Sequence, residues 1–268
     1  MKINMSPKDF VSEIKQELKM MLSCHEMQPT LAIINTYDTA ANMSYIKGKL
    51  KDAEEIGIIA DLIKIDPDTD VETFSRKIRE LPHDGIILQL PLHPNFESFK
   101  EELLASIPPE KDVDGLGRGG LFTPCTPLGV KIFLDHNKID LKGKNVVIVG
   151  RSELVGKPLA QLMTDADATV TLCHSHTRNL WYYTSMADIV VCAIGRPKFF
   201  GTDYFLDNKT KIVIDVGINR VDGKLVGDVD PAVADNVAYL TPVPGGVGLL
   251  TRMALMCNTC IAAMIRKE

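Results

Sequence analysis

Apolar residues in the first third of the chain alternate between helical spacing and short continuous runs. Between Phe10 and Leu22 an apolar residue recurs at every fourth position, which predicts an amphipathic first helix. The apolar runs that follow are bounded by polar residues or glycine and predict strands. Because strands and helices alternate, the pattern predicts a parallel α/β layer. The elements expected after the first helix are a strand at 30–35, a helix at 42–55, a strand at 57–65, a helix at 71–79 and a strand at 85–90.

The second half of the chain repeats this alternation and is typical of a nucleotide-binding fold. A loop rich in Gly and Pro (111–127) and a helix at 128–136 precede it. The last helix (251–266) is apolar on most sides, so we expect it to pack on both domains or to fold back on the first. The strands expected between them lie at 145–149, 169–173, 189–192 and 211–215, with a helix from about residue 155.

Length and composition fit two modest α/β domains and narrow the partners. The 268 residues are 45% apolar and 24% charged, which is enough apolar material for two cores. The net charge of -5 gives no basic excess, so we expect no nucleic-acid partner. The start of the chain is polar, and we expect no run of the roughly 20 apolar residues that a membrane span needs. The predicted domains are 1–137 plus 250–268, and 138–249.

The cysteines and histidines predict neither disulfides nor a metal. The spacing of the six cysteines matches no disulfide framework, which favours reduced thiols in a cytoplasmic protein. Cys257 and Cys260 form a CxxC without a second pair, so on a helix they fit core positions better than a metal site. His174 and His176 alternate on an extended segment and point to opposite sides. We therefore predict no metal.

A glycine turn after the strand at 145–149 is the candidate cofactor loop. The chain runs from Gly150 through Arg151 and Ser152 to Gly156 and Pro158, where a helix is expected. A strand, a glycine turn and a helix start make a ready anion site, because backbone N–H groups are free there. The fingerprint GxGxxG is absent, so a plain turn between strand and helix remains an alternative.

The next strand end favours NADP over NAD. An NAD site usually has Asp or Glu at this position to hold the ribose hydroxyls, but 173–178 contains no carboxylate. Arg151, Ser175 and Arg178 would serve a 2′-phosphate better.

Tyr45, Lys49 and Gln89 are the candidates for proton chemistry. Tyr45 and Lys49 lie four apart on the expected helix and share one face. Gln89 ends an apolar strand, where α/β folds place ligands, and its neutral carbonyl could orient the amine without fixing a charge on it. The alternatives are an ordinary exposed helix pair and a strand-end amide that faces water. Short-chain dehydrogenases also use Tyr-x-x-x-Lys, but after the nucleotide loop rather than before it.

Two loops complete the candidate chemistry. Lys111 to Gly115 offers two carboxylates, of which Asp114 could accept two N–H bonds from a guanidine-like edge such as a pterin. The segment 241–248 contains two prolines that stiffen it and three glycines that let a ligand touch backbone. It lacks the ending of a phosphate-binding P-loop.

Taken in order, these motifs resemble the bifunctional methylenetetrahydrofolate dehydrogenase/cyclohydrolase family, over nearly the whole chain. The motifs that carry the resemblance are Tyr45 to Lys49, Gln89 to Leu92, Lys111 to Gly115, Pro124 to Pro127, Gly150 to Pro158 and Pro244 to Gly248.

The resemblance implies a folate-binding catalytic domain, a Rossmann-like NADP-binding domain, a cleft between them and a homodimer. It makes Lys49 the catalytic acid/base, tuned by Gln89 beside Tyr45. The substrate-binding residues it implies are Tyr45, Gln89, Leu90, Pro91, Asp114, Pro244, Gly245 and Gly246. The NADP-binding residues it implies are Thr126, Gly150, Arg151, Ser152, Val155, Gly156, Pro158, Ser175, Gly195 and Ile218.

The implied reaction is oxidation of methylene-tetrahydrofolate followed by hydrolysis to 10-formyl-tetrahydrofolate. The chain departs from the family pattern at Asn42, where serine is usual, in the short segment 115–122, and at Leu249 and Leu250, where Pro-Met is usual. A dehydrogenase with weak cyclohydrolase activity and a non-catalytic binder of NADP or folate therefore remain alternatives.

Overall fold

The computed structural model describes residues 3–117, 119–205 and 208–266, without the side chain of residue 208. The chain folds into two compact units. We call Ser12–Cys125, together with the chain from Arg252 onward, the leading unit, and Thr126–Thr251, together with the chain up to Val11, the central unit. Both contain a parallel sheet covered by helices, so the predicted α/β class is confirmed.

The leading unit is built on a sheet of three parallel strands in the order β2-β1-β3. Local signals set its helix ends: the side chain of Thr39 accepts a hydrogen bond from the Asn42 N–H before α2, and Gly57 ends that helix with a φ of 100°. The elements are β1 (Thr30–Asn35), α2 (Ala40–Ile56), β2 (Ile59–Lys64), α3 (Val71–Glu80), β3 (Gly85–Leu88), α4 (Pro94–Glu97) and α5 (Lys100–Ala105).

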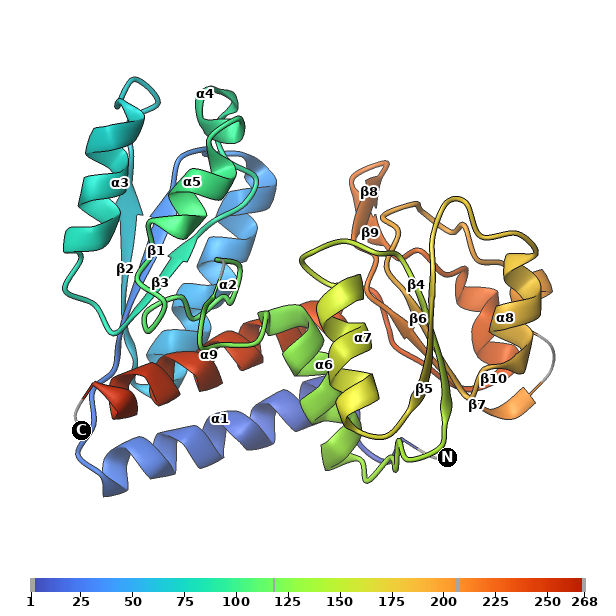
Figure 1. Cartoon of the computed structure of the whole chain (residues 1–268). Coiled ribbons are helices and arrows are strands. Elements are labelled where there is room, and N and C mark those ends of the chain that lie inside the picture. The colour runs from blue at the N-terminus through green and yellow to red at the C-terminus, as the bar shows by residue number, and fades with distance from the viewer. Residues whose placement is uncertain (1–2, 118, 206–207, 267–268) are drawn as a thin grey trace. The chain divides into compact units, whose positions relative to one another are not determined.

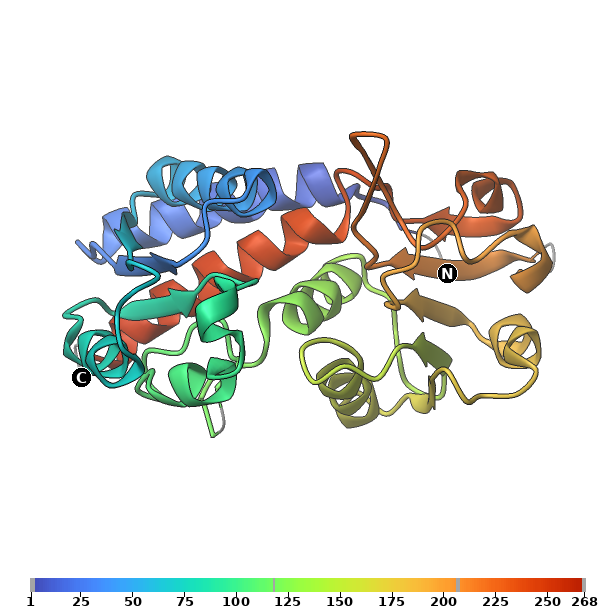
Figure 2. The ribbon, with the colours of Figure 1, turned by 90° about the horizontal axis from the view of Figure 1, so that it is seen from above.

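The two faces of this sheet are covered by different helices. Figure 2 shows α2 on one side of the strands and α3 and α5 on the other. Alternate residues of the strands, such as Ile34 and Ile86, pack with Phe74 of α3 and Leu103 of α5 in one fully buried cluster. This packing leaves the carboxyl ends of β1 and β3 and one face of α2 to form a site.

The central unit is built on a five-stranded parallel sheet in the order β10-β7-β6-β4-β5. Figures 1 and 2 agree in placing α6 and α7 on one face of this sheet and α8 on the other. The elements are α6 (Cys125–His136), β4 (Asn145–Val149), α7 (Gly156–Asp165), β5 (Thr169–Cys173), α8 (Leu180–Met186), β6 (Ile189–Cys192), η1 (Thr202–Tyr204), β7 (Asn208–Asp215), the hairpin β8 (Asn219–Val221) and β9 (Lys224–Val226), η2 (Pro231–Asp235) and β10 (Val237–Leu240).

The strand order contains one point where the chain reverses its direction of winding across the sheet. After β4 the chain moves outward to β5, then returns to β6 on the other side of β4 and continues to β7 and β10. Doubly wound sheets bind ligands outside the carboxyl ends of the strands at such a point. The loops after β4 and β6 therefore mark the candidate cofactor site.

Two long helices, α1 (Pro7–Cys24) and α9 (Val247–Ile265), have residues in both units. By length and composition α9 could cross a membrane, contrary to our expectation that no segment approached that length, but 56% of its apolar window is buried in the protein. Cys260 on α9 is buried and Cys257 is partly buried. A core helix accounts for both observations.

The elements that the sequence did not predict are short. They are α4, α5, α8, η1, the β8–β9 hairpin, η2 and β10. Helices of four to seven residues complete at most two turns, so hydrophobic periodicity barely registers in them.

Candidate functional site

Lys49 of α2 meets Gln89 in the leading unit. The Lys49 Nζ donates a hydrogen bond of 2.9 Å to Gln89 Oε1, and the two residues are 8% and 7% exposed. Gln89 Nε2 in turn donates to the Leu90 carbonyl at 2.8 Å, which fixes which end of the amide faces the lysine. Within residues 3–117, 119–205 and 208–266, this buried amine therefore has a neutral hydrogen-bond partner and no carboxylate bonded to it.

The surroundings of Lys49 favour its uncharged form. Burial lowers the pKa of the ammonium, because the charged form loses its hydration. The charge of Asp114 acts in the opposite direction, and the Arg252 guanidinium acts in the same direction as burial. A neutral amine can accept a proton, which is what a general base must do.

Tyr45 lies one helical turn before Lys49 and is partly buried. Burial raises the pKa of its phenol, with the charge of Arg252 opposing that effect. The phenol therefore stays protonated over the physiological range. Its ring and hydroxyl are available to a ligand as an apolar surface and a hydrogen-bond donor.

The two carboxylates of the 111–115 loop have separate roles. Asp112 is 1% exposed and accepts hydrogen bonds from Gly115 N at 3.1 Å and Gly117 N at 2.7 Å, so it holds the loop. Asp114 is partly buried, and its charge acts on both Lys49 and Cys125. Asp114 is therefore near enough to Lys49 for the two to interact, and its role in binding a pterin stays a prediction.

Asn42 ties the start of α2 to the turn after β3. Its side-chain nitrogen donates to the carbonyls of Tyr37 and Pro91, both at 3.0 Å, and the residue is 2% exposed. The bond to Pro91 fixes the segment that follows Gln89 directly. The departure from serine at this position thus has a structural function that the sequence did not reveal.

In the central unit the Gly150 turn is as tight as predicted. Gly150 has a φ of +123°, and a Cβ there would lie 2.1 Å from the Ala193 carbonyl oxygen. A Cβ at Gly156 would lie 1.9 Å from the Gly150 carbonyl oxygen. Only glycine fits at either position, so β4 passes into α7 through one compact turn.

The anion-binding groups of this turn differ from those the pattern suggested. Ser152 accepts hydrogen bonds from the N–H groups of Val155, Gly156 and Lys157, so these donors are occupied. Arg151 and Ser152, which precede α7 in the chain, are exposed. The loop therefore offers a guanidinium and a hydroxyl, rather than those backbone donors, to a phosphate.

Arg151 and Ser175 follow strands that run side by side. Val149 and Cys173 are paired at the ends of β4 and β5, and each of these two residues comes two positions later. Ser175 is exposed in a turn that Thr177 closes by hydrogen bonds with His174. The turn contains no carboxylate, so it fits a 2′-phosphate better than a ribose diol.

Asp228, which the sequence did not single out, holds the predicted cofactor residue Gly195 and also Asn219, the neighbour of the predicted Ile218. Asp228 is fully buried and accepts hydrogen bonds from Gly195 N at 2.9 Å and from Asn219 Nδ2 at 2.9 Å. It also accepts from Ile194 N and Arg196 N, so one carboxylate orders the loop after β6 and the chain beside the exposed Ile218. Such a role needs tertiary contacts and has no local signature.

The remaining predicted residues lie in the central unit. Pro244 and Gly245 are exposed, whereas Gly246 is buried, and a Cβ at Gly246 would lie 2.2 Å from the Pro242 carbonyl oxygen. Thr126 shares a hydrogen bond of 3.0 Å with Thr251. The structure thus groups Lys49, Tyr45, Gln89, Leu90, Pro91 and Asp114 in one unit, and the predicted cofactor residues with Pro244 to Gly246 in the other.

Family models match both parts of the chain. The catalytic domain of tetrahydrofolate dehydrogenase/cyclohydrolase matches residues 5–114, and the NAD(P)-binding domain of the same family matches residues 124–267. The chain belongs to this family. The resemblance, the two-domain α/β fold and the enzyme class predicted from the sequence are confirmed.

Individual relatives cover almost the entire chain. A bifunctional protein FolD from Hydrogenobaculum sp. is 40% identical, over 94% of this chain and 95% of the relative. The bifunctional FolD enzyme of Campylobacter jejuni has a solved structure with a TM-score of 0.90 at 38% identity, covering 97% of this chain and 98% of that one. The Trypanosoma brucei enzyme, solved with NADP and an inhibitor, gives 0.89 at 30% identity, over 100% and 99% of the two chains.

Proposed function

We propose that this protein oxidises 5,10-methylenetetrahydrofolate with NADP and hydrolyses the methenyl product to 10-formyltetrahydrofolate. The observation that carries the proposal is the buried Lys49–Gln89 pair, 2.9 Å apart, beside Tyr45 and Asp114. Family membership and the bifunctional relatives support the same pair of reactions.

Lys49 is proposed as the acid/base of the hydrolysis. Water adds to the methenyl carbon, and a neutral Lys49 amine accepts the first proton that the water loses. The new hydroxyl then loses its remaining proton and becomes the formyl carbonyl as the C–N bond to N5 breaks, and N5 takes a proton. Gln89 keeps the amine oriented without adding a negative charge that would hold it protonated. Positioned proton transfer of this kind contributes about 10²- to 10⁴-fold in rate.

Tyr45 and Asp114 are proposed to bind the substrate. The Asp114 carboxylate can accept two N–H bonds from the pterin edge, and the partly buried Tyr45 ring offers an apolar surface to the rest of the molecule. Leu90 and Pro91, which follow Gln89, are proposed to bind the substrate as well. The same role is proposed for Pro244, Gly245 and Gly246 of the central unit. Orientation alone is worth up to about 7–11 kcal/mol in such sites.

The central unit is proposed to hold NADP, which accepts hydride from the methylene carbon when bound. Arg151 and Ser175 would pair with the 2′-phosphate, and the Gly150 to Pro158 turn would face the pyrophosphate. Thr126, Gly195 and Ile218 complete the proposed contacts. Comparable kcat/KM with NAD and NADP would contradict the preference for NADP.

Beyond the reaction itself, we propose a cytoplasmic homodimer that uses neither a membrane nor a nucleic acid and supplies one-carbon units for purine biosynthesis. We also propose that residues 1–137 plus 250–268 form the folate-binding catalytic domain and that residues 138–249 form the dinucleotide-binding domain. Sedimentation of the purified protein tests the dimer directly.

The test of the proposed function measures the two half-reactions separately. Purified protein should form methenyltetrahydrofolate from methylenetetrahydrofolate only with a dinucleotide, and should accelerate loss of the methenyl absorbance without one. Cofactor-dependent oxidation without accelerated hydrolysis would favour the dehydrogenase alternative. Binding of NADP or folate without turnover would favour the non-catalytic alternative.

A further inference from the structure

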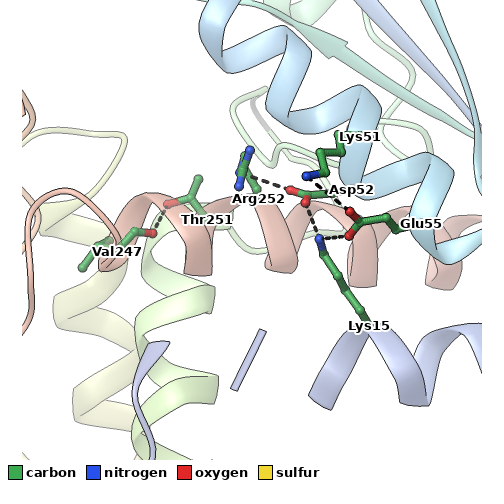
Figure 3. Close-up of polar contacts among 7 residues, drawn as sticks. All are labelled: Lys15, Lys51, Asp52, Glu55, Val247, Thr251 and Arg252. Atoms are coloured by element: carbon green, nitrogen blue, oxygen red, sulfur yellow. Dashed lines mark hydrogen bonds and ion pairs between the residues drawn. The ribbon is translucent and has the colours of Figure 1, made fainter. Parts of the chain in front are cut away.

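A second group of charges lies on the same face of α2 as Lys49. Asp52 is 3% exposed, and its Oδ2 lies 3.1 Å from the Arg252 Nε of α9. Its Oδ1 lies 2.5 Å from the Lys15 Nζ of α1. Figure 3 shows Asp52 between these two cations. The proposed reaction gives this buried carboxylate no function of its own.

Gly48 makes room for the guanidinium. A Cβ at Gly48 would lie 1.8 Å from Arg252 Nη1 and 2.9 Å from Arg252 Cζ. The guanidinium therefore rests directly against the helix backbone, one residue from Lys49. Glycine inside a helix costs about 0.5–1 kcal/mol relative to alanine, so the close approach has an energetic cost.

The guanidinium also lies within electrostatic range of the two reactive groups. Tyr45, Gly48, Lys49 and Asp52 fall at helical positions i, i+3, i+4 and i+7, which form one stripe. The Arg252 charge lowers the pKa of Tyr45 and, acting with burial, that of Lys49. Arginine stays protonated at every relevant pH, so this positive charge is constant.

We propose that Arg252 and Asp52 are positioning residues for Lys49: Asp52 anchors the guanidinium over Gly48, and the fixed charge there favours the neutral, proton-accepting amine. Lys15 binds the second oxygen of Asp52 and holds the carboxylate in place. This inference rests on the proposed function and adds to it a device that sets the pH range of the hydrolysis.

The other groups around Lys49 act with or against the charge of Arg252. The Asp114 carboxylate favours the protonated amine, and burial is the largest effect against it. Burial raises the pKa of the Cys125 thiol well above its usual value, so this group stays uncharged, and Gln89 carries no charge. Removing the Arg252 charge should therefore let Asp114 act with less opposition, and removing the Asp52 anchor should have the same but smaller effect, because the guanidinium can then leave Gly48.

The experiment is a pH profile of methenyltetrahydrofolate hydrolysis, corrected for the uncatalysed rate, for the native protein and the variants Arg252→Met, Arg252→Lys and Asp52→Asn. We expect the acidic limb to move up by about 0.5–1 pH unit in R252M and up by a smaller amount in D52N, since an amide holds the guanidinium against Gly48 less firmly than a carboxylate does. R252K keeps the charge and should keep the limb near its native position. The matched control is Lys131→Met, which removes a cation from an ion pair with Asp135 in the central unit and should leave the limb unmoved.

Upward shifts in R252M and D52N, with an unmoved limb in R252K, support the proposal, because a merely structural role would lower kcat without moving the limb. An unmoved limb in R252M, or a limb in D52N that stays in place or moves down, overturns it. If R252M fails to fold by circular dichroism, D52N and R252K decide the outcome with the same criteria. Absence of hydrolysis in the native protein would instead refute the proposed function, and the two failures are thereby distinguished.

Discussion

Among the residues that the structure describes, two lysines are buried, Lys49 and Lys211, and their hydrogen-bonding environments differ. Lys49 in the leading unit is 8% exposed and Lys211 in the central unit is 0% exposed. Burial lowers the pKa of both, with nearby carboxylates opposing: Asp114 for Lys49 and Asp188 for Lys211. A depressed pKa therefore does not by itself separate a reactive lysine from a structural one.

The hydrogen-bond partners make the distinction. Lys211 Nζ donates to the carbonyls of Thr184 at 2.8 Å and Ser185 at 3.1 Å, and also to that of Ala187, which uses all three donors of an ammonium. The Lys49 Nζ donates to one neutral amide. Lys211 thus closes the end of α8 onto β7, while Lys49 retains capacity to exchange a proton with a ligand.

The largest expected effect is on activity, from Lys49→Met. The substitution removes the proposed base while filling its volume, so hydrolysis should fall by about 10³-fold or more. The midpoint of urea unfolding should fall only slightly, because one neutral acceptor, Gln89 Oε1, loses its donor. Hydrolysis at the native rate would refute the role given to Lys49. Lys211→Met is the matched control and should retain kcat.

Lys211→Met should instead reduce stability. It leaves three carbonyls at the end of α8 without their donor, and we expect a loss of about 2–4 kcal/mol in the free energy of unfolding. Urea denaturation followed by circular dichroism measures this loss. Equal losses in the Lys49 and Lys211 variants would remove the distinction between the two sites.

Gln89→Glu tests the neutral partner of Lys49. A carboxylate at 2.9 Å would stabilise the ammonium and raise the pKa of Lys49. We expect hydrolysis at neutral pH to fall about 10- to 100-fold, with much of the rate recovered as the pH rises. A uniform loss across the pH range would indicate that Gln89 acts on substrate binding rather than on the amine.

Asn42→Ala should have a smaller effect. It removes the amide that links Tyr37 and Pro91, which we expect to cost about 1–2 kcal/mol of stability and to raise the KM for folate more than it lowers kcat. Steady-state kinetics with both half-reactions would show it. Asn42→Ser tests whether a hydroxyl replaces either hydrogen bond. An unchanged KM in Asn42→Ala would show that the turn at Pro91 keeps its conformation without the bond from Asn42.

The smallest effect is the pH dependence of stability. The folded pKa of Lys211 lies below its ordinary value of 10.5, so between the two values the unfolded chain binds more protons. The contribution of Lys211 to stability therefore grows as the pH rises toward 10.5 and is lost as it falls. Unfolding free energies measured from pH 7 to 10 should rise less steeply in Lys211→Met than in the native protein. An identical slope would show that Lys211 keeps its ordinary pKa.

Much of the site was predictable because its signals are local. The four-residue spacing of Tyr45 and Lys49, the amide of Gln89 at a strand end and the glycine at position 150 each follow from a few neighbouring residues. The structure brings Lys49 and Gln89 together as expected. The roles of Asp228, Asn42 and Arg252 were not predictable in the same way, because each depends on a partner that is distant in the sequence. The contacts are Asp228–Arg196, Asn42–Pro91 and Asp52–Arg252, and the two residues of each pair are at least 32 positions apart.

The sequence alone determined which side chains carry the chemistry and on which element each one lies, because helical and strand periodicity depend on adjacent residues. Only the tertiary structure decided how those side chains are protonated and held. Chain segments that are distant in sequence supply the burial of these groups and their partners. They include the hydrogen bonds of Lys49 and Lys211 and the guanidinium of Arg252 against Gly48. Electrostatic energies in a folded protein depend on distance and on exclusion of water, and neither quantity exists until the chain has packed.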